Sequence, residues 1–388
     1  VDAEPIENGI IEIQHGRIVA VHSTADPEAE DLGNVAIIPG LINAHTHLEF
    51  SDLAKPVEPP RPFSHWIRAV VEQRRNHTGP SAVDRGVQES CQSGTTTLGE
   101  IATSDWPRSG FPAHGLRTVL FRELLGLLPE QANEQLAIAR THLELNHGES
   151  NLIRGLSPHA PYSVHPDLFQ QLVELANEFQ APLSVHLAET KAELELLSQG
   201  TGELVEMLAD FGVWQQNIIS PGTRPLDYLQ LLEKLDHVLI VHGNYLSDDE
   251  LDFLAEHPNM TVVYCPRTHH YFGHDEHPWQ ELLNRNINVA MGTDSLASNP
   301  NLSLWEELCF LRDRYPGVAP QTLLELGTLS GARALGLDDE TGSLSMGKIA
   351  DLAVVSSDNF RWGNDAYSQL FDQKQRITRT MHAGRWNQ

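Results

Sequence analysis

The chain has 388 residues, of which 40% are hydrophobic and 20% are charged. This balance is typical of a folded globular protein and excludes a mainly disordered, collagen-like or coiled-coil chain. Asp and Glu (53) outnumber Lys and Arg (26), which gives a formal net charge of -27. Because such a surface repels phosphate backbones and anionic lipids, the composition argues against a nucleic-acid-binding or membrane-associated protein.

The three cysteines, Cys91, Cys265 and Cys309, are widely separated and form no CxxC pair. This usage predicts a reducing, cytoplasmic compartment and no disulfide framework. No stretch approaches the roughly 20 apolar residues of a membrane span, and the start lacks the apolar core of a signal peptide. Since the sequence begins at Val1, we expect a few residues to precede it.

Both ends of the chain have sequence patterns typical of short strands. The segment GIIEIQHGRIVAVHS alternates apolar and polar residues around Gly16, which predicts a hairpin, and GSLSMGKIADLAVVSS has a similar pattern near the other end. We therefore expect residues 1–39 and 337–388 to form one composite β-sandwich domain. Residues 40–336 would then form a separate central domain.

The central region alternates β-rich runs with amphipathic segments, a pattern typical of βα units and a parallel sheet. Eight such runs are expected: 37–47, 95–101, 118–123, 153–158, 183–186, 238–242, 261–264 and 288–292. Eight units in this length fit an α/β fold of the (β/α)8 TIM-barrel type. A doubly wound open sheet is the alternative that periodicity leaves open.

Histidines and carboxylates follow most of these runs, where a barrel places its catalytic groups. His45 and His47 are two residues apart on a strand, so both side chains point to the same side. An isolated pair of this kind is more often hydrogen-bonded core histidines. With His186 and Asp294 at other strand ends, however, the set predicts a site for Zn²⁺, Fe²⁺ or Mn²⁺.

Glu189 follows His186 by three residues, where a carboxylate can act as general base toward a water molecule. The alternative is an ordinary acidic residue at a helix start. His242, at the next strand end, is expected to polarise the same water or the substrate, against the alternative of a structural core histidine. Glu100 and Glu123 either face the mouth of the barrel or pair with barrel arginines. For the histidine-rich segment RTHHYFGHDEHP we favour a loop that covers the substrate over a second metal site.

Several motifs resemble the amidohydrolase superfamily when they are taken together and in order. They are PGLINAHTHLEFS, HAPYSVHP, HLAET, VHGNYLSDDE and GTDSLASN. The resemblance covers essentially the whole chain. It points to the branch of metal-dependent aminohydrolases with cytosine, guanine, S-adenosylhomocysteine and aminodeoxyfutalosine deaminases and triazine hydrolases.

The resemblance implies a role for each matching residue. His45, His47, His186 and Asp294 correspond to metal ligands, Glu189 to the proton-shuttling glutamate and His242 to the histidine that orients the water. His159 occupies a position that contacts substrate. Binuclear relatives carry a bridging carboxylated lysine after the fourth strand, whereas IRGLSPHAPYS has none. The resemblance thus implies one divalent metal ion, with Zn²⁺ first and Fe²⁺ or Mn²⁺ as alternatives, and a homodimer.

The reaction implied is hydrolytic deamination, in which Glu189 moves a proton from water to a ring nitrogen and Asp294 helps to protonate the departing ammonia. The segments PFSHWIRAVVEQRRN, RELLGL and CPRTHHYFGH look most like the aminodeoxyfutalosine deaminase group, whose substrate is an adenine-type nucleoside with a benzoate-like tail. Arg267 is then the expected contact of that tail. The alternatives are S-adenosylhomocysteine or methylthioadenosine, a free base such as guanine or cytosine, a triazine-type substrate, or a catalytically silent scaffold.

Overall fold

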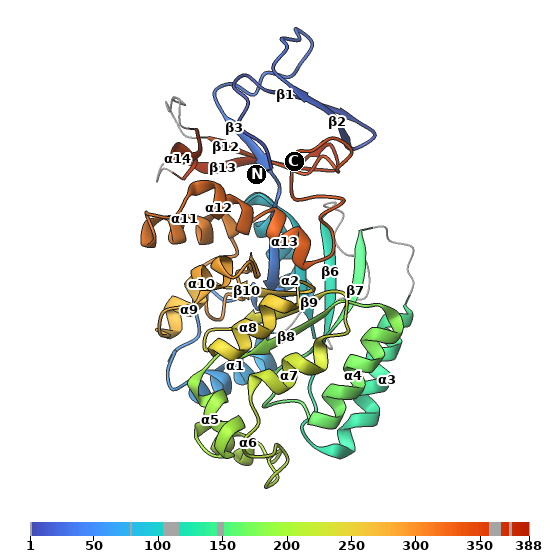
Figure 1. Ribbon diagram of the computed structural model, residues 1–388, viewed down its shortest axis with the longest axis vertical. Coiled ribbons are helices and arrows are strands. Elements are labelled where there is room, and N and C mark those ends of the chain that lie inside the picture. The colour runs from blue at the N-terminus through green and yellow to red at the C-terminus, as the bar shows by residue number, and fades with distance from the viewer. Residues whose placement is uncertain are drawn as a thin grey trace.

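An eight-stranded parallel sheet forms the centre of the molecule (Figure 1), seen in a computed structural model that describes residues 2–77, 80–103, 116–145, 151–356, 366–371 and 375–387. In spatial order its strands are β4 (Leu41–Thr46), β5 (Thr95–Ala102), β6 (Arg117–Leu124), β7 (Leu152–Pro158), β8 (Leu183–Leu187), β9 (Val238–His242), β10 (Met260–Tyr264) and β11 (Asn288–Met291). A parallel bridge between Thr46 and Asp294 connects the last strand to the first. The predicted (β/α)8 barrel is confirmed.

Helices cover the outside of the barrel, so its strands are buried on both faces. Strands β4, β5, β8, β9 and β10 are buried along their whole length, as expected of parallel strands with both faces covered. The helices are α1 (Phe63–His77), α2 (Pro80–Gln92), α3 (Ala132–Glu144), α4 (Pro166–Phe179), α5 (Lys191–Gln199), α6 (Glu203–Asp210), α7 (Pro225–Leu232), α8 (Asp248–Glu256), α9 (Pro266–Phe272), α10 (Trp279–Asn284), α11 (Leu304–Arg314), α12 (Pro320–Leu326) and α13 (Leu329–Ala334), with short 3₁₀ turns at Leu48–Phe50 and Pro129–Gln131.

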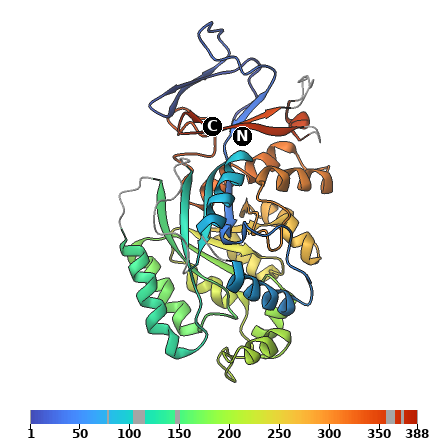
Figure 2. The same ribbon diagram turned by 180° about the vertical axis from the view of Figure 1, so that it is seen from behind.

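Two small sheets lie at one end of the barrel, as both views show (Figures 1 and 2). One is the antiparallel hairpin of β1 (Ile10–Gln14) and β2 (Arg17–His22). The other has the order β14-β13-β12-β3, formed by Arg385–Trp386, Arg376–His382, Leu352–Ser356 and Ala36–Pro39, with α14 (Ala366–Leu370) nearby in sequence. Because β3 pairs with β12, segments from both ends of the chain share one sheet. The domain boundaries themselves stay a prediction.

The predicted run 37–47 is divided in the structure into two strands of different sheets. Strand β3 ends at Pro39 and pairs with β12, whereas β4 begins at Leu41 and pairs with β5. Gly40 lies between them, so close to β5 that an added Cβ would be 2.3 Å from the Thr96 side chain. A glycine here lets the chain pass from the small sheet into the barrel wall. The expectation of one continuous strand was wrong for this reason.

No helix in the described ranges is both long enough and apolar enough to cross a membrane.

Candidate active site

The predicted ligands meet at the carboxyl ends of the barrel strands. His45 lies in β4 and His47 directly follows it, His186 lies in β8, and Asp294 follows β11. Parallel strands end at the same edge of the barrel, so residues far apart in sequence converge there. The ligand atoms of His45, His47 and His186 all lie within 4.8 Å of one another.

Asp294 adds a carboxylate to the three imidazoles. Its Oδ1 lies 3.6 Å from His45 Nε2 and 3.7 Å from His47 Nε2, which is too long for hydrogen bonds but short for unrelated side chains. Burial by itself raises the pKa of Asp294, yet the imidazoles around it hold that pKa below its usual value. The other oxygen, Oδ2, accepts a hydrogen bond of 2.7 Å from Ser298 Oγ. Asp294 therefore keeps Oδ1 directed at the histidines.

The unpaired nitrogens of these histidines fit a metal ion. His45 Nδ1, His45 Nε2 and His47 Nδ1 are buried and have no hydrogen-bond partner, which is costly for polar atoms in a protein interior. Burial lowers the pKa of His47 to about 3, so its imidazole is neutral at physiological pH. The Nδ1–H of His186 donates to the carbonyl oxygen of His159 at 2.9 Å, an arrangement that leaves Nε2 as a ligand atom. Neutral imidazoles fixed in this way are the donor set of a Zn²⁺ site.

Glu189 and His242 lie side by side next to the ligand group. His242 Nε2 is 3.5 Å from Glu189 Oε1, and the His242 ring centroid is 5.4 Å from that of His186. Burial, and then the negative charges of Asp294 and Glu193, raise the pKa of Glu189 well above its usual value. Burial also lowers the pKa of His242 to about 3. The pair thus combines a strengthened proton acceptor with a neutral imidazole.

The turns that carry these groups contain residues in the left-handed region. Ala188 has φ 52°, His242 has φ 70° and Asp294 has φ 55°. Residues other than glycine rarely adopt such φ angles. These angles persist only where the surrounding structure holds the backbone in place. Such residues cluster at functional sites.

The predicted substrate residues lie at different distances from this centre. The His159 ring centroid is 4.9 Å from that of His186, and its Nδ1 is hydrogen bonded to Ser163 Oγ. Glu123 is buried and its carboxylate lies 3.5 Å from the Arg74 guanidinium. Both oxygens of Glu100 accept the backbone N–H of Leu48 at 3.2 Å, so this residue supports the turn after β4. Contact with substrate stays a prediction for all three.

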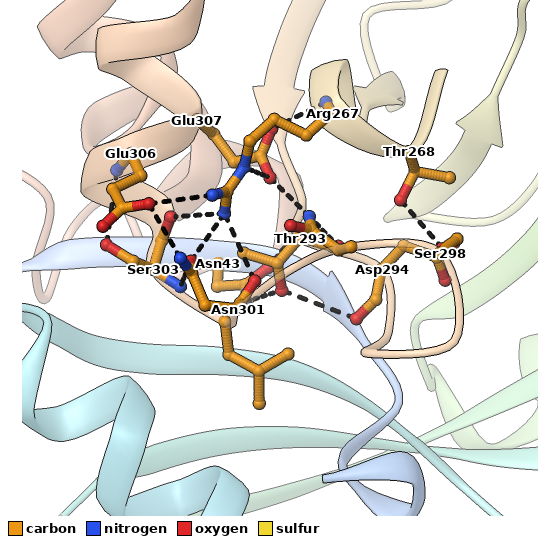
Figure 3. Close-up of polar contacts among 12 residues, drawn as sticks. Asn43, Arg267, Thr268, Thr293, Asp294, Ser298, Asn301, Ser303, Glu306 and Glu307 are labelled. Carbon is orange, nitrogen blue, oxygen red and sulfur yellow. Dashed lines mark hydrogen bonds and ion pairs between the residues drawn. The ribbon is translucent and has the colours of Figure 1, made fainter. Parts of the chain in front are cut away.

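The structure gives Arg267 another set of contacts (Figure 3). Its Nε donates to Glu307 Oε1 at 2.7 Å and its Nη1 to Glu306 Oε2 at 3.0 Å. Its Nη2 donates to the Asn301 side chain and to the carbonyl oxygens of Asn301 and Ser303. Every nitrogen of the guanidinium already has an acceptor from the protein. These contacts favour a structural role over the predicted contact with a substrate tail.

The histidine-rich segment, whose first part is helix α9, lies against the strand end that carries His242. His277 Nε2 donates to the carbonyl oxygen of His242 at 2.8 Å, and the His269 ring is 5.4 Å from that of His274. Within the described ranges, only His45, His47 and His186 bring three ligand atoms within 4.8 Å of one another. The described histidines of this segment therefore form no second group of this kind. The segment was expected to be a loop, but its first part is helix α9, and a role in covering the substrate stays a prediction.

Sequence reasoning missed three supporting residues. Glu193 and Glu307 are fully buried carboxylates on the helices that follow β8 and β11, and Ser298 orients Asp294. A signal existed for Glu193, because Thr190-x-x-Glu193 has the spacing of a capping box at a helix start. No local pattern marks Glu307, since its partner Arg267 is 40 residues earlier in the chain.

Comparison with known proteins adds an independent line of evidence. The profile of the amidohydrolase family matches residues 36–386. An aminodeoxyfutalosine deaminase of Deinococcus radiodurans is 32% identical over 318 residues, which cover 79% of this chain and 75% of that protein. A 5-methylthioadenosine/S-adenosylhomocysteine deaminase of Halalkalibacterium halodurans is 30% identical over 380 residues, with coverages of 91% and 82%. The structure of an adenosine deaminase from Xanthomonas campestris with bound zinc is similar with a TM-score of 0.79 at 26% identity, covering 98% of this chain and 88% of that one.

Proposed function

The chain belongs to the amidohydrolase family, and we propose that it is a metal-dependent deaminase that removes the exocyclic amino group of an adenine-type nucleoside. Hydrolysis of a C–N bond agrees with the deaminase names of its relatives. The observation that carries the proposal is the Glu189–His242 pair, 3.5 Å apart, beside the convergent group of His45, His47 and His186. This arrangement combines a proton acceptor with a metal-binding group.

The proposal includes one divalent metal ion, Zn²⁺ in the first place, with Fe²⁺ and Mn²⁺ as alternatives. His45, His47, His186 and Asp294 would hold it. Its support is the unpaired buried nitrogens of the histidines, together with the absence of lysine from β7, which reads LIRGLSP. When bound, a metal ion in such a site supplies Lewis acidity, which lowers the pKa of water toward neutrality.

Glu189 is the group that moves the proton. Its carboxylate accepts a proton from the attacking water as the water oxygen bonds to the ring carbon that carries the amino group. It then delivers this proton to the neighbouring ring nitrogen. Burial favours this role because it raises the pKa of Glu189 and makes the carboxylate a stronger proton acceptor.

His242 and Asp294 act on the same carbon. The neutral His242 imidazole, next to Glu189 Oε1, is placed to hydrogen bond with the attacking oxygen and to stabilise the tetrahedral carbon. Asp294 takes the remaining proton of the hydroxyl group on the tetrahedral carbon and passes it to the leaving nitrogen, so that the C–N bond breaks with release of ammonia and the oxygen stays on the ring carbon as a carbonyl. Departure of an amine requires a proton, whereas departure of chloride does not. The presence of Glu189 thus favours deamination over dechlorination.

Aminodeoxyfutalosine is the first substrate candidate, because the Deinococcus radiodurans relative bears that name at 32% identity. Methylthioadenosine and S-adenosylhomocysteine are the second, on the longer match to the Halalkalibacterium halodurans relative. The guanidinium of Arg267 already donates to Glu307 and Glu306, so it gives no support for binding of a carboxylate-bearing substrate tail at that residue. A homodimer and a cytoplasmic location remain part of the proposal.

Ammonia release tests the proposed reaction. The metal-loaded protein is assayed with aminodeoxyfutalosine, methylthioadenosine, S-adenosylhomocysteine, adenosine, guanine, cytosine and a triazine. We expect stoichiometric ammonia from at least one adenosine derivative and none from the free bases. A preference for a free base, or no activity with any adenosine derivative, would contradict the nucleoside proposal.

Elemental analysis tests the metal. Protein purified without added metal should contain close to one transition-metal ion per chain, as expected of four protein ligands without a bridging lysine. A stoichiometry of two, with both ions required for turnover, would overturn the single-ion proposal.

A further inference from the structure

The turn between β8 and α5 carries Glu189 in a backbone conformation that needs outside support. Ala188, the residue before Glu189, has φ 52°. The left-handed region is unfavourable for an alanine because its Cβ approaches the carbonyl oxygen. The direction of the Glu189 side chain therefore depends on contacts that keep this turn in place.

A single buried side chain makes the main contact with the N–H groups of this turn. Glu193 Oε1 accepts the N–H of Ala188 at 3.0 Å, and Oε2 accepts the N–H of Glu189 at 2.9 Å. The Thr190 hydroxyl in turn accepts the N–H of Glu193 at 3.1 Å, which fixes the start of α5. Glu193 thus reaches back past the helix start and holds the two residues that set the direction of the catalytic side chain.

The carbonyl groups of the same turn are held from the other side. Ala188 O accepts the N–H of Tyr245 at 3.1 Å, and Glu189 O accepts Asn244 Nδ2 at 2.9 Å. Both donors lie just after His242 in the chain. The turn with Glu189 is therefore clamped between Glu193 and the segment that presents His242.

Glu193 also places a carboxylate near Glu189, and none of the cations in the described ranges is paired with it. Its only hydrogen bonds that affect ionisation come from the backbone N–H groups of residues 188–190, and burial still raises its pKa to about 7. Removing a carboxylate from water is expensive unless its hydrogen bonds or a nearby cation repay the cost, and Glu193 has only the backbone hydrogen bonds among the described residues. The cost is reasonable if the carboxylate serves the neighbouring catalytic group.

We propose that Glu193 is a positioning residue for Glu189: it fixes the turn that directs the catalytic carboxylate and places a second carboxylate beside it. This inference rests on the proposed function, in which Glu189 moves the proton. Glu193 itself contacts backbone atoms and takes no part in bond making.

A double-mutant cycle of Glu193→Gln and Glu189→Gln tests the coupling. Glutamine has nearly the same size, but its NH₂ group faces a backbone N–H where an oxygen is needed. We expect E193Q alone to lower kcat about 10-fold to 100-fold with little change in KM and in metal content. In the E189Q background the same change should have no further effect on kcat. Equal losses in both backgrounds would overturn the proposal.

Glu250→Gln is the matched control. Glu250 is also buried, lies at the same position of its helix, α8, and accepts the N–H of Ser247 at 2.6 Å. It lies 3.5 Å from the Arg224 guanidinium, and among the described residues it has no hydrogen bond or ion pair with the turn of Glu189. E250Q should keep kcat within about twofold of the wild type, whereas a loss as large as that of E193Q would mean that any disturbed helix start impairs the enzyme and would contradict a specific role.

Amide hydrogen exchange gives a readout that does not depend on turnover. In E193Q, peptides covering residues 187–190 should exchange faster while the rest of α5 stays protected, and unchanged exchange would overturn the clamp even if no substrate is turned over. Absence of ammonia release by the wild type would instead contradict the proposed function.

If E193Q folds poorly, a second variant keeps the test possible: Ala188→Gly in the same chain relieves the strain of the left-handed residue. The combined variant should regain stability but not kcat, and full recovery of kcat would refute the proposal.

Discussion

The two acidic residues of the site, Glu189 and Asp294, lie on turns with the same construction. Each turn follows a barrel strand and contains a non-glycine residue in the left-handed region. Each is supported by a fully buried glutamate from the helix that comes next, Glu193 of α5 for the first and Glu307 of α11 for the second. Glu307 acts through Asn299, whose Nδ2 bonds both to Glu307 and to the carbonyl oxygen of Thr293, next to Asp294.

The two supports differ in how their charge is balanced. Glu307 receives two hydrogen bonds from Arg267, one from its Nε and one from its backbone N–H (Figure 3). Glu193 has no such cation among the described residues and accepts only backbone N–H groups. The carboxylate of Glu307 is thus held by a cation as well as by Asn299. A carboxylate without a cation also raises the pKa of its neighbour, which here is Glu189, the proposed proton-transfer residue.

Substitutions of Glu189 and of Asp294 should have the largest effects on turnover, and they should differ in their effect on metal content. We expect Glu189→Gln to lower kcat by about 10²–10⁴-fold, because an amide cannot accept the proton of water, while the metal content is unchanged. Asp294→Asn should lose both turnover and metal, since it removes the charged ligand. Steady-state ammonia release and elemental analysis on the same preparations measure both quantities. Wild-type turnover in E189Q would refute the assigned base.

Arg267→Ala removes the cation that pairs with Glu307, the glutamate that supports the turn of Asp294. This change leaves the buried Glu307 without its cation, and breaking a buried pair in this way costs about 3–5 kcal/mol. Thermal or denaturant unfolding measures the loss. Because the Arg267 guanidinium donates to protein acceptors and not to substrate, kcat/KM should fall by the same factor for aminodeoxyfutalosine and for methylthioadenosine.

Arg267→Met combined with Glu307→Gln is the control, since it removes both charges at similar volume. We expect it to recover much of the stability that R267A loses. A selective loss of affinity for aminodeoxyfutalosine in R267A would restore Arg267 to the substrate site and would contradict its structural role.

The sequence predicts the barrel well because parallel strands buried on both faces leave continuous β-rich runs. Seven of the eight expected runs each overlap one observed strand, whereas the run 37–47 covers two, β3 and β4, which are divided at Gly40. That division depends on the approach of Thr96 to Gly40, a tertiary contact without a local pattern. Hydrophobic patterning marks the whole run as strand, and only the change in texture along the chain, which suggested a domain boundary after residue 39, pointed to this position.

Prediction of the site was uneven for the same reason. His45 and His47 could be assigned to one side of a strand from their spacing, and the structure brings His186 to them. Arg267 was expected to face the substrate because a basic residue near the barrel mouth suits an anionic tail. Its partner Glu307 comes from α11, after the next barrel strand, so the pairing is invisible until the chain is folded.

Glu193, which has no paired cation among the described residues, should make the stability of the protein depend on pH. The pKa of Glu193 is about 7 in the folded protein and lies near 4.5 when the chain is unfolded. Between these values the folded protein holds a proton that the unfolded chain has lost, so the free energy of unfolding falls as pH rises through this window. Glu193→Gln removes the titrating group, and the stability of the wild type relative to E193Q should therefore decrease from pH 5 to pH 8.

Unfolding by urea at several pH values measures this difference, at about 1.4 kcal/mol per unit of pKa shift. The titratable groups that face Glu193 are Glu189, Tyr162 and Tyr228. The tyrosines have raised pKa values and stay neutral in this range, and the raised pKa of Glu189 acts in the same direction as that of Glu193. A stability difference that grows with pH would contradict the raised pKa of Glu193.

The smallest effect should come from the hydroxyl that orients Asp294. Ser298 Oγ donates to Asp294 Oδ2 and also contacts Thr268 Oγ1 at 3.0 Å. Ser298→Ala leaves Oδ2 without this donor and lets the carboxylate rotate, so we expect the affinity for the metal to fall by about 10-fold, the lower end of the effect of such supporting residues. Competition with a chelator measures the affinity. Thr268→Val keeps the bond from Ser298 to Asp294 and should change the affinity less than S298A does. Equal losses in the two variants would mean that the hydroxyl pair stabilises the loop as a whole, and that the orientation of Asp294 is set by its backbone alone.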